Sequence, residues 1–393
     1  MGFKTNKVKL DFTSYPHFVF IGQRGIGKTT FFYDLVQKVY GSQEYGALIS
    51  CGNENAYSHL DGLQVDDAKV WTKPYGFGEQ DLPEEKWSRG FIEIVDAIIE
   101  GKELPKVKMV AIDTIDELYS IAKMQVFKEH EAEKNKKCKS LNEALGGYGA
   151  GKERVIDLIQ QQIARLHDAG YAVFLFGHTK IKEKTDPITM NVYEVFTNNM
   201  PDGFYSAIAD TAQMAVNIIT EYEDYEEYKT KKTMDNKKEE YQVGRNLNEG
   251  KRYMYFRETG FINAKSRFRK IDTKTEFSVE NFLDVFERAV KSQMNNEISD
   301  KEFKEEKEKE IKNNDEIMKI KRNEKKETNG EKLDSLKQLI SKEIKRIKET
   351  NDSSKLESLK ETLVKNGYAK LTDYKSEENS NKLEEILTSL SSI

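Results

Sequence analysis

A glycine-rich stretch near the start of the chain ends in a lysine and two threonines. Residues 22–30 read GQRGIGKTT, with four residues between Gly22 and Gly27, followed by Lys28 and Thr29. Loops of this pattern wrap around phosphates with their backbone N–H groups pointing inward, and the helix that follows adds the positive end of its dipole. Lys28 then reaches the β- and γ-phosphates, and Thr29 binds Mg²⁺. The predicted binding segment for a nucleoside triphosphate is Gly22, Gln23, Arg24, Gly25, Ile26, Gly27, Lys28, Thr29 and Thr30.

A carboxylate that follows an apolar run supplies the second part of such a site. Asp113 comes directly after VKMVAI (107–112), at the position from which an aspartate orients the water shell of Mg²⁺. Thr114, and not a glutamate, comes next, so the carboxylate that activates water must lie elsewhere. The nearest candidate is Glu54, just after the apolar run 46–51, and Glu117 is the alternative.

Two further groups have side chains that can respond to a γ-phosphate. His178 lies in the stretch FLFGHTK, where a polar side chain at the end of a strand next to that of Asp113 can sense the phosphate. Lys265 and Arg267 stand two residues apart, on one side of an extended segment. In oligomeric ATPases such cations reach the γ-phosphate of a neighbouring subunit. The predicted catalytic residues are therefore Lys28, Glu54, Asp113, His178, Lys265 and Arg267.

These residues need a scaffold that brings the ends of several strands together. Between residue 17 and about residue 290, short apolar runs alternate with amphipathic stretches, a pattern typical of a parallel sheet covered by helices. The expected strands are 17–21, 46–51, 107–112, 171–176 and 212–219, and the expected helices are 28–40, 86–100, 114–133 and 152–168. The sequence predicts an α/β fold with a mostly parallel sheet flanked by helices.

Beyond residue 290 the composition changes. Residues 299–332 are almost wholly charged, with no apolar face wide enough to bury, and we interpret 291–332 as a charged helical or flexible linker. Leucine and isoleucine then return at helical spacing, which predicts a small helical C-terminal module over 333–393. The expected core is 1–290, with an exposed charged insertion at about 221–250. A chain cut near residue 296 is accordingly expected to keep a folded core.

Composition and charge limit the partners and the cellular compartment that we expect for this protein. The net charge is only −5, so bulk attraction to nucleic acid is absent and any nucleic-acid site must be local. Cys51 and Cys138 match no metal-ligand spacing and fit a reducing compartment. The first residues lack the apolar core of a signal peptide, and no run approaches the roughly 18 residues that a membrane helix needs. We expect a soluble cytoplasmic protein with no membrane partner.

Taken in order, these stretches resemble the phage-encoded RecA-like nucleotide-binding ATPases, the family that includes the phage single-strand-annealing ATPases. The resemblance covers about residues 15 to 290 and rests on GQRGIGKTT, LISCGNENA, VAIDTIDELY, GGYGAGKERVIDLI, FLFGHTK and ETGFINAKSRF. It implies a RecA-like P-loop core that binds and hydrolyses ATP with Mg²⁺. It also implies a homo-oligomer that acts on single-stranded DNA in recombination or replication, in the cytoplasm of a host cell.

In the RecA-like arrangement, the loops after the Asp113 helix and the His178 strand face the axis of the oligomer. Here these loops are 135–152 and 179–203. Cations for phosphates and aromatic rings for bases are what sequence-tolerant single-strand binding needs. The first loop region offers Lys134, Lys136, Lys137 and Lys139 ahead of GGYGAG, and the second offers Lys180, Lys182 and Lys184 with Tyr193 and Phe196. We predict that the second group of lysines contacts DNA, and the other interpretation of both groups is an ordinary solvated surface.

Three functions fit these features. The first is a DNA-stimulated ATPase that assembles on single strands and promotes annealing or strand exchange. The second is a nucleotide-switched assembly or loading factor whose C-terminal helices bind a protein partner, such as a phage replication or recombination protein. The third, a small-molecule P-loop kinase, is disfavoured because the chain has no compact arginine-rich lid and because His178, Lys265 and Arg267 have no role in it.

Overall fold

The computed structural model describes most of the chain. The described residues are 7–52, 57–73, 89–222, 225–229, 242–246, 250–294, 299–349, 353–365, 368, 374 and 380–391. Glu54, most of the predicted insertion and the first part of the predicted helix 86–100 lie outside them. Within the described residues the chain divides into two compact units, 1–317 and 318–393.

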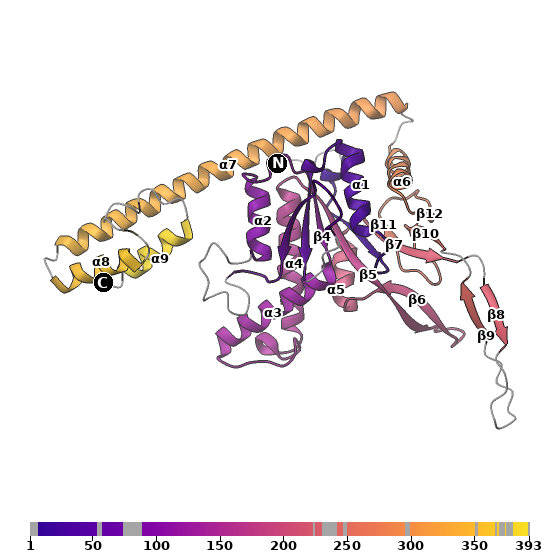
Figure 1. Cartoon of the computed structure of the whole chain (residues 1–393), viewed down its shortest axis with the longest axis horizontal. Coiled ribbons are helices and arrows are strands. Elements are labelled where there is room, and N and C mark those ends of the chain that lie inside the picture. The colour runs from indigo at the N-terminus through magenta and orange to yellow at the C-terminus, as the bar shows by residue number, and fades with distance from the viewer. Residues whose placement is uncertain are drawn as a thin grey trace, which may run out of the picture. The chain divides into compact units, whose positions relative to one another are not determined.

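A mostly parallel sheet forms the centre of the first unit (Figure 1). Its parallel strands are β1 (Phe18–Gly22), β2 (Gly46–Cys51), β3 (Gln64–Ala68), β4 (Met109–Asp113), β5 (Ala172–Thr185) and β7 (Met214–Glu221). Their order across the sheet is β7-β1-β5-β4-β2-β3, and β10 (Lys251–Tyr255) and β12 (Lys274–Glu276) continue it antiparallel beyond β7. The carboxyl ends of β1, β5 and β4 therefore meet at one edge of the sheet.

Helices cover both faces of this sheet. On one face α1 (Lys28–Tyr40) contacts α6 (Val279–Lys291). On the other, α4 (Ala150–Asp168) contacts α2 (Phe91–Glu100), α3 (Ile115–Lys134) and α5 (Asp202–Thr211). The predicted α/β fold class is confirmed, and the described parts of the predicted strands and helices lie close to the predicted ranges, except for β5, which continues to Thr185 instead of ending at residue 176.

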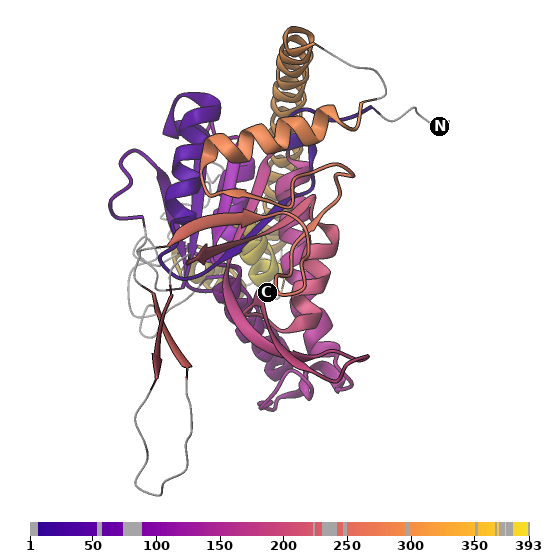
Figure 2. The same ribbon diagram turned by 90° about the vertical axis from the view of Figure 1, so that its right-hand side faces the viewer.

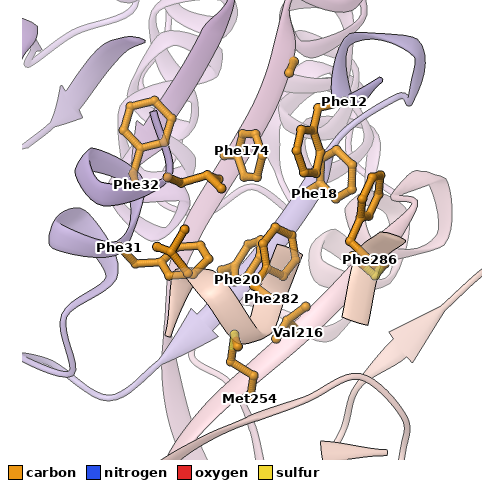
Figure 3. Packing of buried hydrophobic residues seen from close by; sticks show 14 of the residues in the cluster. Phe12, Phe18, Phe20, Phe31, Phe32, Phe174, Val216, Met254, Phe282 and Phe286 are labelled. Atoms are coloured by element: carbon orange, nitrogen blue, oxygen red, sulfur yellow. The ribbon is translucent and has the colours of Figure 1, made fainter. Parts of the chain in front are cut away.

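Phenylalanines dominate the core under α1 and α6 (Figure 3). Phe18 and Phe20 alternate along β1, so both side chains point to the same face. The Phe18 ring stacks on Phe174 of β5, with 5.0 Å between the ring centroids, and Phe12 stacks on Phe286 of α6 at 4.4 Å. This packing fixes β1, and with it the loop that follows Gly22, against the rest of the sheet.

β5 is longer than predicted, and this changes the structure of the segment 179–203. After the buried residues 172–178, the strand continues to Thr185 and pairs antiparallel with β6 (Val192–Asn198). We call this two-stranded ribbon the arm; it leaves the sheet at the lower side of Figure 2. The alternating run KIKEKT gave no apolar signal for a strand, because most of the side chains on both faces of the arm are exposed.

Two short strand pairs complete the described part of the first unit. β11 (Lys265–Ser266) pairs with the start of β7, and β8 (Tyr225–Lys229) pairs with β9 (Gln242–Asn246) as a separate two-stranded sheet. The pair β8–β9 falls within the predicted insertion.

The charged segment after residue 299 packs on the core along its first part. It belongs to one helix, α7 (Asp300–Glu349), whose Phe303 is 1% exposed within the phenylalanine core. The Glu310 carboxylate accepts hydrogen bonds from the backbone N–H of Leu10 (3.1 Å) and the hydroxyl of Ser14 (2.7 Å). The boundary between the two units, after residue 317, lies inside the predicted linker 291–332. The part of α7 before this boundary is attached to the core by one buried aromatic side chain and a few polar contacts, and it therefore needs no wide apolar face.

The second unit has a hydrophobic cluster of its own. It combines the end of α7 with α8 (Ser353–Lys365) and α9 (Ser380–Ser391). The buried members are Leu336, Ile340, Ile344, Ile347, Leu359, Leu363, Tyr368, Tyr374, Leu383, Ile386 and Leu390. Among the described residues, none of the helices combines the length and apolar character needed to cross a bilayer.

A buried histidine at the start of β1 makes the stability of the first unit sensitive to acid. The His17 ring nitrogen Nε2 lies 2.9 Å from the Ile208 carbonyl oxygen, and burial lowers the pKa of His17 to about 4. The unfolded chain takes up this proton near pH 6.5, so stability falls as the pH drops from about 6.5 to 4, by about 3 kcal/mol in total. Urea unfolding at pH 7 and pH 4.5 should show this loss, and His17→Gln, which keeps a donor for Ile208, should reduce it. An unchanged pH dependence in the variant would assign the loss to other groups.

Candidate functional site

The glycine-rich loop joins β1 to α1 as its pattern predicts. Gly25 and Gly27 have φ angles of +71° and +103°, which side chains other than glycine rarely adopt. The Lys28 side chain curls back so that its Nζ donates to the carbonyl oxygens of Gly22 (3.2 Å) and Gln23 (3.1 Å). Lys28 is only 6% exposed. The loop therefore holds a buried ammonium group beside the N-terminus of α1, an arrangement suited to a polyphosphate.

Thr29 and Asp113 meet next to this loop. The Thr29 hydroxyl donates to Oδ2 of Asp113 at 2.7 Å, and both residues are buried. One hydroxyl and one carboxylate fit Mg²⁺, which prefers oxygen ligands and takes the rest of its octahedral shell from phosphates and water. In the described part of the chain, no group of three or more His, Cys, Asp or Glu side chains forms a metal site of protein ligands alone. The donor set thus fits a magnesium ion that arrives with a nucleotide and neutralises phosphate charge there.

His178 lies in β5 at the last residue that pairs with β1, beside the phosphate loop. In the parallel register it is the partner of Gly22, the first residue of the loop. Its backbone N–H donates to Oδ2 of Asp116 at 2.9 Å, and its ring Nδ1 lies 3.3 Å from the same oxygen. Asp116 was not singled out from the sequence, because an acidic residue in the first turn of a helix usually serves the helix dipole.

Of the two predicted water-activating glutamates, the structure describes one. Glu54 lies outside the described residues. Glu117 follows Asp116 but packs against Gly52 at the end of β2, where a Cβ on the glycine would lie 3.2 Å from the Glu117 Oε2. Since β2 and β5 lie on opposite sides of β4, Glu117 is directed away from the strand of His178.

Lys265 and Arg267 lie toward the opposite end of the sheet from the phosphate loop. Lys265 pairs with Ala215 in the ladder, and the Arg267 N–H donates to the Gln213 carbonyl, whereas Gly22 is level with Ile218. Five strand residues correspond to about 16 Å. The Lys265 ammonium lies 2.6 Å from Asp210, and the Arg267 guanidinium donates to the Ala212 carbonyl at 2.9 Å. The two cations are therefore not beside the phosphate loop of their own chain.

Comparison with known protein families agrees with this site. A family model described as an AAA domain matches residues 14–268, which is more than half of the chain and includes the phosphate loop, Asp113 and His178. The chain belongs to this AAA domain family. The family consists of P-loop ATPases, so nucleotide binding follows from membership as well as from the geometry. A search of the curated proteins finds no match.

Next to the phosphate loop, the AAA domain has a pocket of about 600 Å³. Gly27 and Thr30 line one side, and Phe277 and Ser278, just before α6, line another. The guanidinium of Arg252 also lines it and donates to the Ile26 carbonyl at 3.1 Å. A pocket of this size accepts a nucleoside. Arg252 and Phe277 could not be recognised as site residues from the sequence, because they come from strands and loops more than 200 residues after the P-loop.

The arm of the AAA domain carries the lysines that were predicted to contact DNA. Lys180, Lys182 and Lys184 alternate with other residues along β5, so they share one face. The partner of Lys184 on β6 is Tyr193, whose side chain is on the same face and is 40% exposed. Phe196 pairs with Ile181 instead and lies on the other face, partly buried against Ile219, Tyr255, Ile262 and Ala264. The arm thus brings together three lysines and one of the two predicted aromatic residues.

Proposed function

We propose that this P-loop ATPase is a RecA-like protein that assembles on single-stranded DNA and uses ATP turnover in recombination or replication, by annealing or strand exchange. The observation that carries the proposal is the lysine face of the arm, defined as Lys180, Lys182, Lys184 and Tyr193. Such a face offers cations to phosphates and a ring to a base, which is how proteins bind single strands without sequence preference. The resemblance of the chain to phage-encoded RecA-like ATPases points to the same role.

The charges of the lysine face are open to a ligand. Lys180 and Lys184 are exposed, and Lys182 forms an ion pair with Asp202 at 2.5 Å, whose side chain is 82% exposed. An exposed pair contributes little stability, so a phosphate can replace the carboxylate at small cost. The second predicted group is weaker support, because Lys134 and Lys137 lie near Glu133 and Glu131, although Tyr148 between its glycines is fully exposed.

A buried amide connects the nucleotide edge of the sheet to the arm. Asn217 on β7 is 0% exposed, and its Oδ1 accepts from the Thr179 hydroxyl at 3.1 Å, next to His178. Its Nδ2 lies 3.3 Å from the Phe196 carbonyl on β6 and 3.4 Å from that of Asn263. Movement of His178 on nucleotide binding is thereby passed to the base of the arm through one fully bonded side chain.

Assembly into a homo-oligomer gives the distant cations a role. Because Lys265 and Arg267 lie away from their own phosphate loop, any contact with a γ-phosphate is made across a subunit boundary. In that arrangement Arg267 exchanges its bond to the Ala212 carbonyl for the nucleotide of a neighbour. An arginine supplied in trans contributes a large rate factor in other P-loop enzymes.

The test is ATP turnover with and without single-stranded DNA, measured over a range of protein concentration. Replacing Lys180, Lys182 and Lys184 by alanine should remove DNA stimulation and reduce the salt dependence of DNA binding by a slope of about 2, or about 0.7 for each lost phosphate contact. The matched control replaces Lys304, Lys309 and Lys312, three exposed lysines of α7. Equal DNA binding by the two triple variants would reject the arm as the DNA site.

The second candidate is a nucleotide-switched assembly or loading factor. The hydrophobic cluster of residues 318–393 favours it, because a unit with a core of its own can present a stable surface to a protein partner. ATP turnover that does not respond to single-stranded DNA at any protein concentration would favour this candidate over the first.

A further inference from the structure

Asp116 lies where β4, β5 and the phosphate loop come together. It is in the first turn of α3, three residues after Asp113, which accepts the Thr29 hydroxyl. Its Oδ2 accepts the His178 N–H at 2.9 Å, and His178 is level with Gly22. Gly177 lies beside this contact, and a Cβ there would be 3.4 Å from the same oxygen. The carboxylate is thus fixed by one oxygen to the strand between Asp113 and the phosphate loop.

The other oxygen of this carboxylate has no hydrogen-bond partner in the part of the chain that the structure describes. Oδ1 of Asp116 is buried and accepts no hydrogen bond from the residues that the structure describes, and the side chain is only 11% exposed. A buried carboxylate oxygen without a donor is costly, so such an atom marks the place of a donor that comes with a ligand or with water. At this edge of the sheet, the ligand is the nucleotide held by Lys28 and Thr29.

We propose that Asp116 is the carboxylate that receives the proton of the attacking water during ATP hydrolysis, a proposal that rests on the proposed ATPase function. Oδ1 accepts a hydrogen bond from that water, while Oδ2 keeps the side chain in position on His178. The water oxygen forms a bond to the γ-phosphorus, and the bond to the β,γ-bridging oxygen breaks with its electron pair leaving on ADP. The water proton passes to Asp116 Oδ1 and then to solvent.

Asp116 and its neighbour Glu117 differ in the strand that each side chain contacts. Asp116 is bound to β5, which lies between β4 and β1, the strand that leads into the phosphate loop. Glu117 packs on Gly52 at the end of β2, on the far side of β4. Two consecutive acids of one helical turn therefore face opposite halves of the sheet, and only the first faces the half with Lys28.

The test compares Asp116→Asn with two other carboxylate-to-amide variants of the full chain. Asn can still accept the His178 N–H, so Asp116→Asn should fold, with a melting temperature near that of the natural protein. Its kcat should fall at least about 100-fold, while its Kd for a fluorescent non-hydrolysable ATP analogue stays within about threefold. Asp157→Asn, on the exposed face of α4, controls for loss of one negative charge. Glu117→Gln tests whether Glu117, instead of Asp116, accepts the proton of the attacking water.

Each outcome decides for or against the assignment. Near-normal turnover of Asp116→Asn overturns it, as does a loss of analogue affinity as large as the loss of kcat, which would show a role in binding alone. A larger loss of turnover in Glu117→Gln also overturns it. If Asp116→Asn is poorly folded, the same measurements on Asp116→Ala replace it, because alanine also removes the base and adds no polar group to the buried site. Absence of turnover in the natural protein would instead reject the proposed ATPase function.

Discussion

Replacing Lys28 with alanine should abolish ATP turnover and sharply weaken nucleotide binding. Arg24 of the phosphate loop is exposed, whereas the Lys28 ammonium is the buried cation that the carbonyl oxygens of the loop hold in place. Loss of one such preorganised donor reduces turnover by about 100- to 1,000-fold, and loss of a full charge opposite a triphosphate should exceed this. Turnover at saturating ATP and the Kd of a fluorescent ATP analogue measure both effects.

Lys106→Ala provides the matched control for this substitution. Lys106 is exposed and pairs with Glu44, just before β4 begins. An exposed ion pair contributes little to stability, so this variant should bind and hydrolyse ATP like the natural protein. Comparable turnover in the Lys28 and Lys106 variants would contradict the assignment of the loop as the phosphate site.

A chain that ends at residue 296 should not keep a stable core, whereas one that ends at residue 322 should. The shorter chain loses Phe303, which is 1% exposed, and removal of a buried phenylalanine side chain typically costs about 3–5 kcal/mol. It also loses Glu310, so the Leu10 N–H and the Ser14 hydroxyl no longer have their partner. Thermal unfolding and soluble yield of the two chains provide the measurement.

Single substitutions on α7 distinguish the effect of losing the Phe303 side chain from the effect of shortening the chain. Phe303→Ala in the full chain should lower the free energy of unfolding of the first unit by about 3–5 kcal/mol. Ile320→Ala on the same helix removes an apolar side chain that is 55% exposed, and it should have little effect. Equal stability of these two variants, together with a soluble and folded chain ending at residue 296, would restore the interpretation of 291–332 as a solvated linker.

The parts of the fold that could be predicted are those in which one physical signal dominates. Buried strands such as Phe18–Gly22 are continuous apolar runs, and the phosphate loop needs glycines where φ is positive. The arm could not be predicted, because its alternating charges resemble those of a loop. The first part of α7 contributes one buried aromatic side chain, Phe303, to the core among many charged residues, too small a signal for a periodicity argument.

Some residues of the candidate site could likewise be predicted from the sequence, and others could not. Lys28, Thr29 and Asp113 follow from a local pattern and meet as expected. Which strand a side chain in the first turn of α3 faces depends on the strand order, which the sequence does not reveal. Glu54 and, as the alternative, Glu117 were therefore predicted as water-activating residues, and Asp116 was not. Lys265 and Arg267 were predicted from their chemistry to reach the γ-phosphate of a neighbouring subunit, and the register of β11 on β7 adds that they lie toward the end of the strand away from their own phosphate loop.

The hydrogen bonds between α7 and the first residues of the core also set an order of events during synthesis. Leu10 leaves the ribosome early, but its acceptor Glu310 follows 300 residues later. At about 5–20 residues per second, this interval lasts about 15–60 s. β1 also cannot pair with its neighbours when it is first made, because β5 and β7 begin at Ala172 and Met214. The apolar strand that leads into the phosphate loop is therefore made about 190 residues before the second of its strand partners begins, and the pocket beside the loop is completed only when Phe277 and α6 follow.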